Sequence, residues 1–336
     1  MSKQSADRTT QTKVNIPFIV TLRGFAALMV CLYHFVCTTT GYINTTWITD
    51  TFWFGQKGVQ VFFIISGIVI PLSMIQWEYH LKLFWKFLYK RFVRIEPPYL
   101  LSVALGVAYL IFRNHFGGSA DVDLTPTFRD VLLHIGYLVP FVDDAHWVNQ
   151  VYWTLSVEFQ YYLCLAILFP LALSKSRWMH LLFVLVFLIP PYFVESKNFF
   201  PHWSAFFMMG IAYALWMTKR WLTTEFVITL LLSLVICLQC LPLVDVVFGS
   251  VTLAVIALFG QCNWSLGNKL GLISYSLYLI HPFIGGAFIN FMSHRFVQPW
   301  EKFLVIGSGT ALSIAAAYVF YRMIEKPAQE WSRRVG

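Results

Sequence analysis

The sequence predicts an all-α integral membrane protein with about ten transmembrane helices and both termini in the cytoplasm. Of its 336 residues, 58% are hydrophobic and only 12% are charged, whereas soluble proteins contain about 25% charged residues. Apolar runs of about twenty residues, the length that crosses a bilayer, recur along the whole chain. Most Lys and Arg residues collect in alternate loops between these runs, and such asymmetry sets the orientation of a membrane protein.

The predicted spans follow one another with short polar connections. They divide the chain into a cytoplasmic N-terminal tail (1–16), a transmembrane domain (17–324) and a cytoplasmic C-terminal tail (325–336). We expect the first span to remain as a signal anchor, because it is too long for a removable signal peptide and lacks a small-residue cleavage site. In chain order, the predicted spans are 17–37, 58–76, 98–112, 151–173, 178–194, 201–218, 222–241, 245–260, 270–292 and 303–324.

The segment after the third span carries a brief apolar piece, VLLHIGYLVPF (131–141), among aspartate residues. A piece of this length is too short to cross the hydrocarbon core. Irregular backbone inside a bilayer also needs protein or water around it. We therefore expect a re-entrant or interfacial element here.

The remaining composition excludes several classes of function. The net charge of +8 follows the loop pattern of a membrane protein, so we expect no nucleic-acid partner. Cys237 and Cys240 form a C-x-x-C pair, but zinc would need a second pair of ligands, so no metal is expected. Serine-hydrolase, zinc-protease and P-loop motifs are all missing from the sequence. We therefore expect no ATP-driven engine.

Two ionisable residues lie inside the first span, LRGFAALMVCLYHF. Arg23 and His34 are eleven positions apart, or about 1100° of helical rotation, so they project from one face. The rise between them is about 16 Å, with Arg23 nearer the cytoplasm. A snorkelling arginine and an interhelical histidine bond would explain each alone. Their shared face favours a functional role.

The segment KRFVRIEPPYL brings Arg91 and Arg94 onto one helical face, three residues apart. They are either ordinary positive-inside residues or a clamp for phosphate groups, which guanidinium forks bind bidentately. We expect Pro97 and Pro98 to end the helix after the pair.

A carboxylate, Glu158, lies in the outer half of the fourth span, at a depth comparable with that of His34. It is expected to orient or charge-balance the imidazole, or else to bond a neighbouring Tyr or Trp. His281, just before Pro282, either lines a cavity or caps freed backbone, and the two readings stay open. We expect Glu325 to be structural.

Two classes of function, an enzyme and a carrier, are consistent with these residues. The first is an enzyme, with a cation cluster at one level of the membrane and an acid–base group at another. The second is a carrier or flippase for an anionic sugar-lipid, in which Arg23, His34 and Glu158 form a binding site and a proton relay. A structural scaffold would leave three ionisable residues at membrane depth unexplained.

The chain resembles the acyltransferase-3 family of bacterial polytopic membrane acyltransferases. The resemblance rests on six segments in order: LRGFAALMVCLYHF with its R-x10-H spacing, GVQVFFIISG, KRFVRIEPPYL, WTLSVEFQYYL, SYSLYLIHPF and IEKP. It implies a ten-helix unit that moves an acyl group, usually acetyl, from cytoplasmic acyl-CoA to a hydroxyl of a glycan or lipid-linked sugar. One departure is Thr154, where family members often have serine.

The resemblance also implies roles for individual residues. Arg23, Arg91 and Arg94 would bind acyl-CoA, and His34 would act as general base or acyl relay with Glu158 in support. We expect a multi-pass protein of the inner membrane, surrounded by lipids, with no fused SGNH-type domain. Its acceptor would be a cell-envelope glycan or lipid-linked sugar, reached directly or through a separate extracytoplasmic partner.

Overall fold

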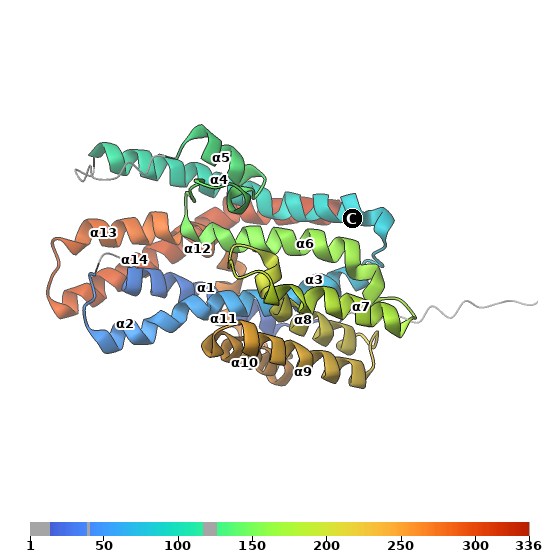
Figure 1. Cartoon of the computed structure of the whole chain (residues 1–336). Helices are drawn as coiled ribbons and strands as arrows, with labels where there is room; N and C mark the ends of the chain where they lie inside the picture. Colours follow the sequence, from blue (N-terminus) through green and yellow to red (C-terminus); the bar gives the residue numbers. More distant parts are fainter. Residues whose placement is uncertain (1–13, 39–40, 117–125, 336) are drawn as a thin grey trace, which may run out of the picture.

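The computed structural model describes residues 14–38, 41–116 and 126–335, and every element in these ranges is a helix (Figure 1). Short 3-10 or π segments, labelled η, interrupt the α-helices. The elements are α1 (Phe18–Tyr33), η1 (His34–Thr38), α2 (Thr46–Trp53), η2 (Phe54–Lys57), α3 (Gly58–Gln76), η3 (Leu81–Leu83), α4 (Phe84–Phe116), α5 (Phe128–Ile135), η4 (Val139–Phe141), η5 (Gln150–Tyr152), α6 (Trp153–Ala172), α7 (Arg177–Leu188), η6 (Pro190–Tyr192), α8 (Phe200–Met217), α9 (Thr223–Cys240), α10 (Leu243–Phe259), α11 (Ser265–Leu272), α12 (Ser274–His281), η7 (Pro282–Gly286), α13 (Ala287–Ser293), α14 (Pro299–Phe320), η8 (Tyr321–Glu325) and α15 (Lys326–Arg334).

Each predicted span falls mainly on helical residues, although not always on one helix, and the number of crossings stays a prediction. Within the described residues, six helical segments are long and apolar enough to cross a membrane. A seventh is added if α11 and the α12–α13 segment, which are bent by 51°, form one broken span. The apolar helices Arg177–Tyr192 and Leu243–Phe259 are shorter.

The third predicted span is only part of a longer helix. The expectation that Pro97 and Pro98 end the helix that carries the arginine pair is wrong, because α4, 33 residues long, runs through both prolines. A proline is tolerated inside a membrane helix when neighbouring groups bond the backbone around it. Pro97 and Pro98 leave the Val93 and Arg94 carbonyls, four residues earlier, without their amide donors, and the next carbonyl, that of Ile95, accepts from the Tyr275 hydroxyl at 3.0 Å.

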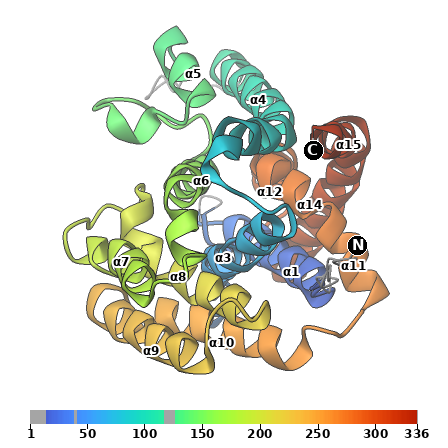
Figure 2. The same cartoon turned by 90° about the vertical axis from the view of Figure 1, so that its right-hand side faces the viewer.

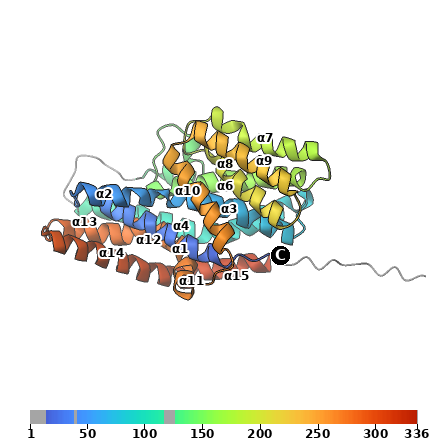
Figure 3. The same cartoon turned by 90° about the horizontal axis from the view of Figure 1, so that it is seen from below.

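The centre of the bundle is α3, which lies among α1, α6 and α8 in the view along the helices (Figure 2). Its most apolar 18-residue window is 78% buried, whereas that of α9, at the periphery, is only 17% buried. Figure 3 shows α7, α8 and α9 grouped on one side, with α11 projecting beside α1. A buried ion pair between Lys57 and Asp245 joins the start of α3 to α10.

The contact between α3 and α8 is made by glycines. A Cβ atom on Gly67 would lie 2.5 Å from the Phe207 carbonyl oxygen, and one on Gly210 would lie 2.5 Å from the Ile64 carbonyl oxygen. Backbone atoms cannot move aside as a flexible side chain can. The glycines of GVQVFFIISG therefore permit close helix packing, as expected of small residues in membrane helices.

We expect Gly67→Ala to destabilise the protein by about 1–3 kcal/mol, because the added methyl group overpacks this contact. Thermal unfolding in detergent would measure the change. Gly307→Ala is the matched control, since a Cβ there meets no heavy atom within 4 Å. Equal stability of the two variants would contradict the packing argument.

The two ends of the described chain lie at the same end of the bundle. Gln76, at the end of α3, donates to the Val14 carbonyl at 3.1 Å, and Ser332 of α15 donates to the Lys90 carbonyl at 2.8 Å. The expected C-terminal tail is thus largely a helix packed on α4, and residues 1–13 of the expected N-terminal tail lie outside the described residues. That this end faces the cytoplasm stays a prediction.

The segment 128–141, which includes the apolar piece after α4, contains the short helix α5 and the turn η4. Its Phe128, Leu132, Ile135 and Phe141 side chains are exposed. Eight residues span about 12 Å, far less than the hydrocarbon thickness. A short helix with exposed apolar side chains agrees with the expected interfacial element.

Candidate active site

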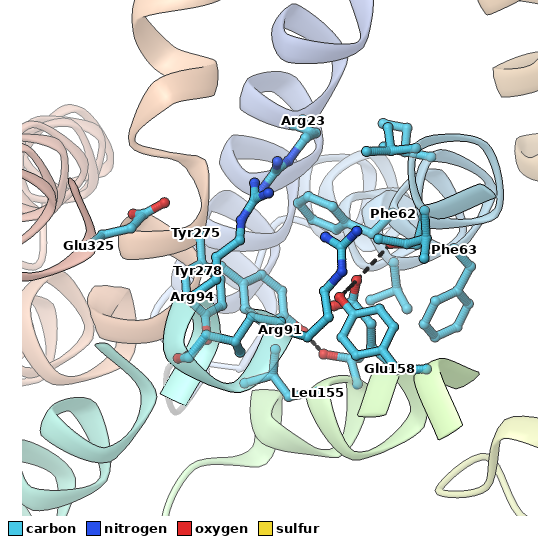
Figure 4. Close-up of a pocket in the computed structure, with 18 of the residues that line it drawn as sticks. Arg23, Phe62, Phe63, Arg91, Arg94, Leu155, Glu158, Tyr275, Tyr278 and Glu325 are labelled. Carbon is cyan, nitrogen blue, oxygen red and sulfur yellow. Dashed lines mark hydrogen bonds between the residues drawn. The ribbon is translucent and has the colours of Figure 1, made fainter. Parts of the chain in front are cut away.

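A pocket of about 110 Å³ opens among α1, α3, α4, α6, α12 and α15 (Figure 4). Arg23 enters it from α1, and Arg91 and Arg94 enter it from α4. The three-residue spacing of the α4 pair puts both side chains on the same helical face. The structure thus brings together the three arginines that the sequence singled out.

The arginines have no ion-pair partner within 4.0 Å among the described residues. Arg91 is only 7% exposed, and its Nε atom is buried without a hydrogen-bond partner in the same part of the chain. Its guanidinium lies 5.3 Å from the Phe87 ring centroid and 5.8 Å from that of Tyr162. Because three guanidinium groups share this lining with two carboxylates, Glu158 and Glu325, and buried charges without a close partner are costly, the pocket suits an anionic ligand.

Glu158 also lines the pocket, beside Arg91 (Figure 4). Its carboxylate accepts hydrogen bonds from the Ser66 hydroxyl at 2.8 Å and the Tyr162 hydroxyl at 2.6 Å. The structure does not bring it to His34, so the expected support of that imidazole by Glu158 is not the observed arrangement. Of the two expectations for Glu158, bonding to a neighbouring tyrosine is the one that the contacts match.

A second carboxylate, Glu325 of η8, lines the pocket near its α15 side. Its oxygens accept hydrogen bonds from the Ser276 hydroxyl and backbone amide and from the Gln329 side chain at 2.8 Å. Gln329 itself reaches the pocket from α15. The expectation that Glu325 is only structural therefore omits its position at the site.

His34 lies beyond the pocket, at the start of the π segment η1. Its Nδ1 is 2.9 Å from the Val30 carbonyl oxygen and 3.1 Å from Nε2 of His281. His281 is fully buried, and its Nδ1 is 3.0 Å from each of the Leu277 and Tyr278 carbonyl oxygens. Sequence reasoning left both interpretations of His281 open, and the structure shows a residue that bonds backbone and also contacts His34.

Aromatic ring contacts connect the arginine pocket with the histidine pair. Phe62 and Tyr278 both line the pocket, and they meet edge to face with ring centroids 5.7 Å apart. The Tyr278 ring centroid is 6.3 Å from that of His281. Tyr278 is held by hydrogen-bond contacts to the Thr154 hydroxyl at 2.8 Å and the Val151 carbonyl at 3.1 Å. Neither histidine belongs to the described lining of the pocket.

Comparison with known protein families assigns the chain to one of them. A family model described as an acyltransferase domain matches residues 16–322, which is nearly the whole chain. The chain belongs to the acyltransferase-3 family. The comparison with curated proteins found no significant match, and neither did the comparison with solved structures.

Membership of the acyltransferase-3 family confirms the resemblance and supports an acyltransferase embedded in a membrane by several helices. The matched range includes Arg23, His34, Arg91, Arg94 and Glu158. In the described part of this acyltransferase-3 protein, no three His, Cys, Asp or Glu side chains form a group that could hold a metal ion.

For the CoA donor that the family resemblance implies, we expect Glu158→Gln in this acyltransferase-3 protein to strengthen binding about two- to tenfold. The amide keeps an acceptor for Ser66 and Tyr162 but removes a negative charge beside Arg91, and charge complementarity governs anion binding. Calorimetric titration with CoA would measure the change. Glu330→Gln, an exposed carboxylate on α15, is the control. Weaker binding in the Glu158 variant would show that its charge instead holds Arg91 in place.

Proposed function

We propose that this protein transfers an acyl group, most often acetyl, from cytoplasmic acyl-CoA to a hydroxyl of a cell-envelope glycan or lipid-linked sugar. The carrying observation is that three guanidinium groups without a carboxylate ion pair in the described residues share one pocket, while His34 lies further along the same helix as Arg23. A cation cluster and an acid–base group at two levels suit a long donor with a charged end and a reactive end.

The charged end of the donor is the phosphate-bearing part of CoA. Arg23, Arg91 and Arg94 bind phosphate oxygens, because a guanidinium presents a planar fork of donors. The buried, unpaired Nε of Arg91 supports this assignment. With Glu158 and Glu325 as the two carboxylates of the pocket, its formal charge stays positive.

The reactive end reaches the level of His34, about 16 Å from Arg23 along α1. An extended pantetheine arm spans such a distance once the Phe62–Tyr278 contact opens. His34 removes the proton of the acceptor hydroxyl while the hydroxyl oxygen attacks the thioester carbonyl carbon. The tetrahedral intermediate collapses, the carbon–sulfur bond breaks, and the imidazolium returns the proton to the CoA thiolate. The products are the ester and free CoA.

Glu158 has a different role in this proposal from the one that the sequence suggested. Its hydrogen bonds to Ser66 and Tyr162 fix it beside Arg91. It therefore reduces the positive charge beside Arg91 at the donor site and does not act on His34. The protein acts in the inner membrane, and its acceptor reaches His34 from the outer side, directly or through a separate extracytoplasmic partner.

The test uses purified protein in lipid nanodiscs with acetyl-CoA, and it needs no identified acceptor. Calorimetry measures binding, and mass spectrometry measures slow release of free CoA, which avoids thiol reagents that would also label the cysteines. Saturable binding with CoA release above empty nanodiscs supports the enzyme. Folded protein that neither binds nor cleaves acetyl-, succinyl- or longer acyl-CoA would overturn the proposal and favour the carrier of anionic sugar-lipids.

A further inference from the structure

We propose that His281 is a positioning residue that holds His34 in the tautomer required of a general base, with the proton on Nδ1 and the lone pair on Nε2. This inference rests on the proposed function of His34. It concerns a side chain that the sequence left without a role and that does not line the donor pocket.

The contacts of His281 determine its own tautomer. Its Nδ1 lies 3.0 Å from two carbonyl oxygens, those of Leu277 and Tyr278. Carbonyl oxygens only accept hydrogen bonds, so this nitrogen must carry the proton. In a neutral imidazole the other nitrogen is then an acceptor. Nε2 of His281, which faces His34, therefore presents a lone pair.

The tautomer of His34 follows from that of His281. Two acceptors lie at its Nδ1: the Val30 carbonyl at 2.9 Å and Nε2 of His281 at 3.1 Å. Nδ1 of His34 must therefore be the protonated nitrogen, which leaves the lone pair on Nε2. A base needs that lone pair to accept the proton of the acceptor hydroxyl.

The local sequence explains why His281 can donate to a backbone carbonyl. In a regular helix the Tyr278 carbonyl would accept from the amide of residue 282, four positions later. Residue 282 is proline, which has no amide hydrogen. The freed carbonyl accepts from the His281 ring instead. His281 thus supplies the donor, and Pro282 leaves the Tyr278 carbonyl free to accept from it and so to orient the ring.

The surrounding backbone holds the pair at a fixed separation. His34 begins the π segment η1, and His281 directly precedes the π segment η7, which packs against η1. Single π turns inside helices frequently occur at functional sites. The ring centroids of the two histidines are 5.0 Å apart, with Tyr33 and Phe35 rings beside them.

The pair also stabilises the intermediate charge. When His34 accepts a proton on Nε2, both of its ring nitrogens become donors. Its bond to Nε2 of His281 is then charge-assisted and stronger than before. His281 therefore acts on the base through a neutral acceptor, in the manner of the outer groups that orient metal-bound histidines.

The first arm of the test measures kinetics in nanodiscs. His281→Leu removes the acceptor, and we expect kcat for CoA release to fall about 10- to 100-fold with an unchanged Kd for acetyl-CoA. His281→Gln places an amide oxygen near the former Nε2 and should restore part of kcat. The control is His134→Gln, a change at another fully buried histidine, whose Nε2 accepts from the Val148 amide. Folded His134→Gln protein should keep its kcat.

The second arm measures the tautomer directly and does not depend on activity. Solid-state ¹⁵N spectra of histidine-labelled protein distinguish protonated from unprotonated ring nitrogens, and the His34→Gln variant identifies the His34 signals. The proposal is supported if His34 shows one tautomer with a protonated Nδ1 in the wild type and a mixture of tautomers in His281→Leu. A protonated Nε2 in the wild type, or full kcat in His281→Leu, overturns it. Wild-type protein without CoA release but with the expected tautomer would reject the proposed function and keep the positioning role.

Discussion

Replacing His34 with alanine is expected to lower kcat for CoA release by about 10²- to 10⁴-fold, the range that general acid–base groups contribute. The Kd for acetyl-CoA should stay unchanged, because His34 lies outside the pocket that contains the arginines. Mass spectrometry of released CoA and calorimetry on the same preparation measure the two quantities.

A second histidine variant separates this effect from a general loss of fold. His80→Ala changes an exposed histidine in the connection between α3 and η3, and it should behave as the wild type. Loss of acetyl-CoA binding in folded His34→Ala protein would contradict the assignment of donor binding to the arginine pocket and of proton transfer to His34. Undiminished CoA release would exclude His34 as base and as acyl relay.

Replacing Arg91 with alanine is expected to weaken acetyl-CoA binding about 10- to 100-fold, because a hydrogen bond to a charged group contributes about 1.5–3 kcal/mol. The double variant Arg91→Ala with Arg94→Ala should lose more than either single variant. Arg91→Lys should recover little, since a lysine cannot present a bidentate fork. Calorimetric titration at two salt concentrations measures the affinities and their electrostatic part.

The control for the arginine series is Arg220→Ala, at an exposed residue that does not line the pocket. It removes the same charge from the protein without touching the donor site. Equal affinities for the Arg220 and Arg91 variants would mean that the pocket attracts CoA only through overall charge. Unchanged affinity in the double variant would remove the pocket as the donor site.

Helical periodicity was sufficient to pair Arg91 with Arg94, which share a face by their spacing. The depth of Arg23 in the first span follows from its distance to the span end. That Arg23 joins the other two came from the family resemblance, and the structure places all three guanidinium groups in one pocket.

Partners between helices could not be obtained in the same way. Glu158 and His34 have comparable depths, but depth does not say which neighbour a side chain faces. Glu158 bonds Ser66 and Tyr162, whereas His34 meets His281, 247 positions along the chain. Local rules also failed at Pro97 and Pro98, because packing around α4 outweighed the preference of proline for helix ends.

The edge-to-face contact of Phe62 and Tyr278 bears on the energy supply of the cell. A water-filled passage from the arginine pocket to the outer face would conduct protons and sodium ions and would dissipate the membrane potential. Apolar constrictions stop such conduction by excluding water. In the proposed mechanism the two rings, which are in contact, would exclude water from such a passage at rest, and the bound donor would fill it during turnover. Acyl transfer by this route would then proceed without an accompanying ion current.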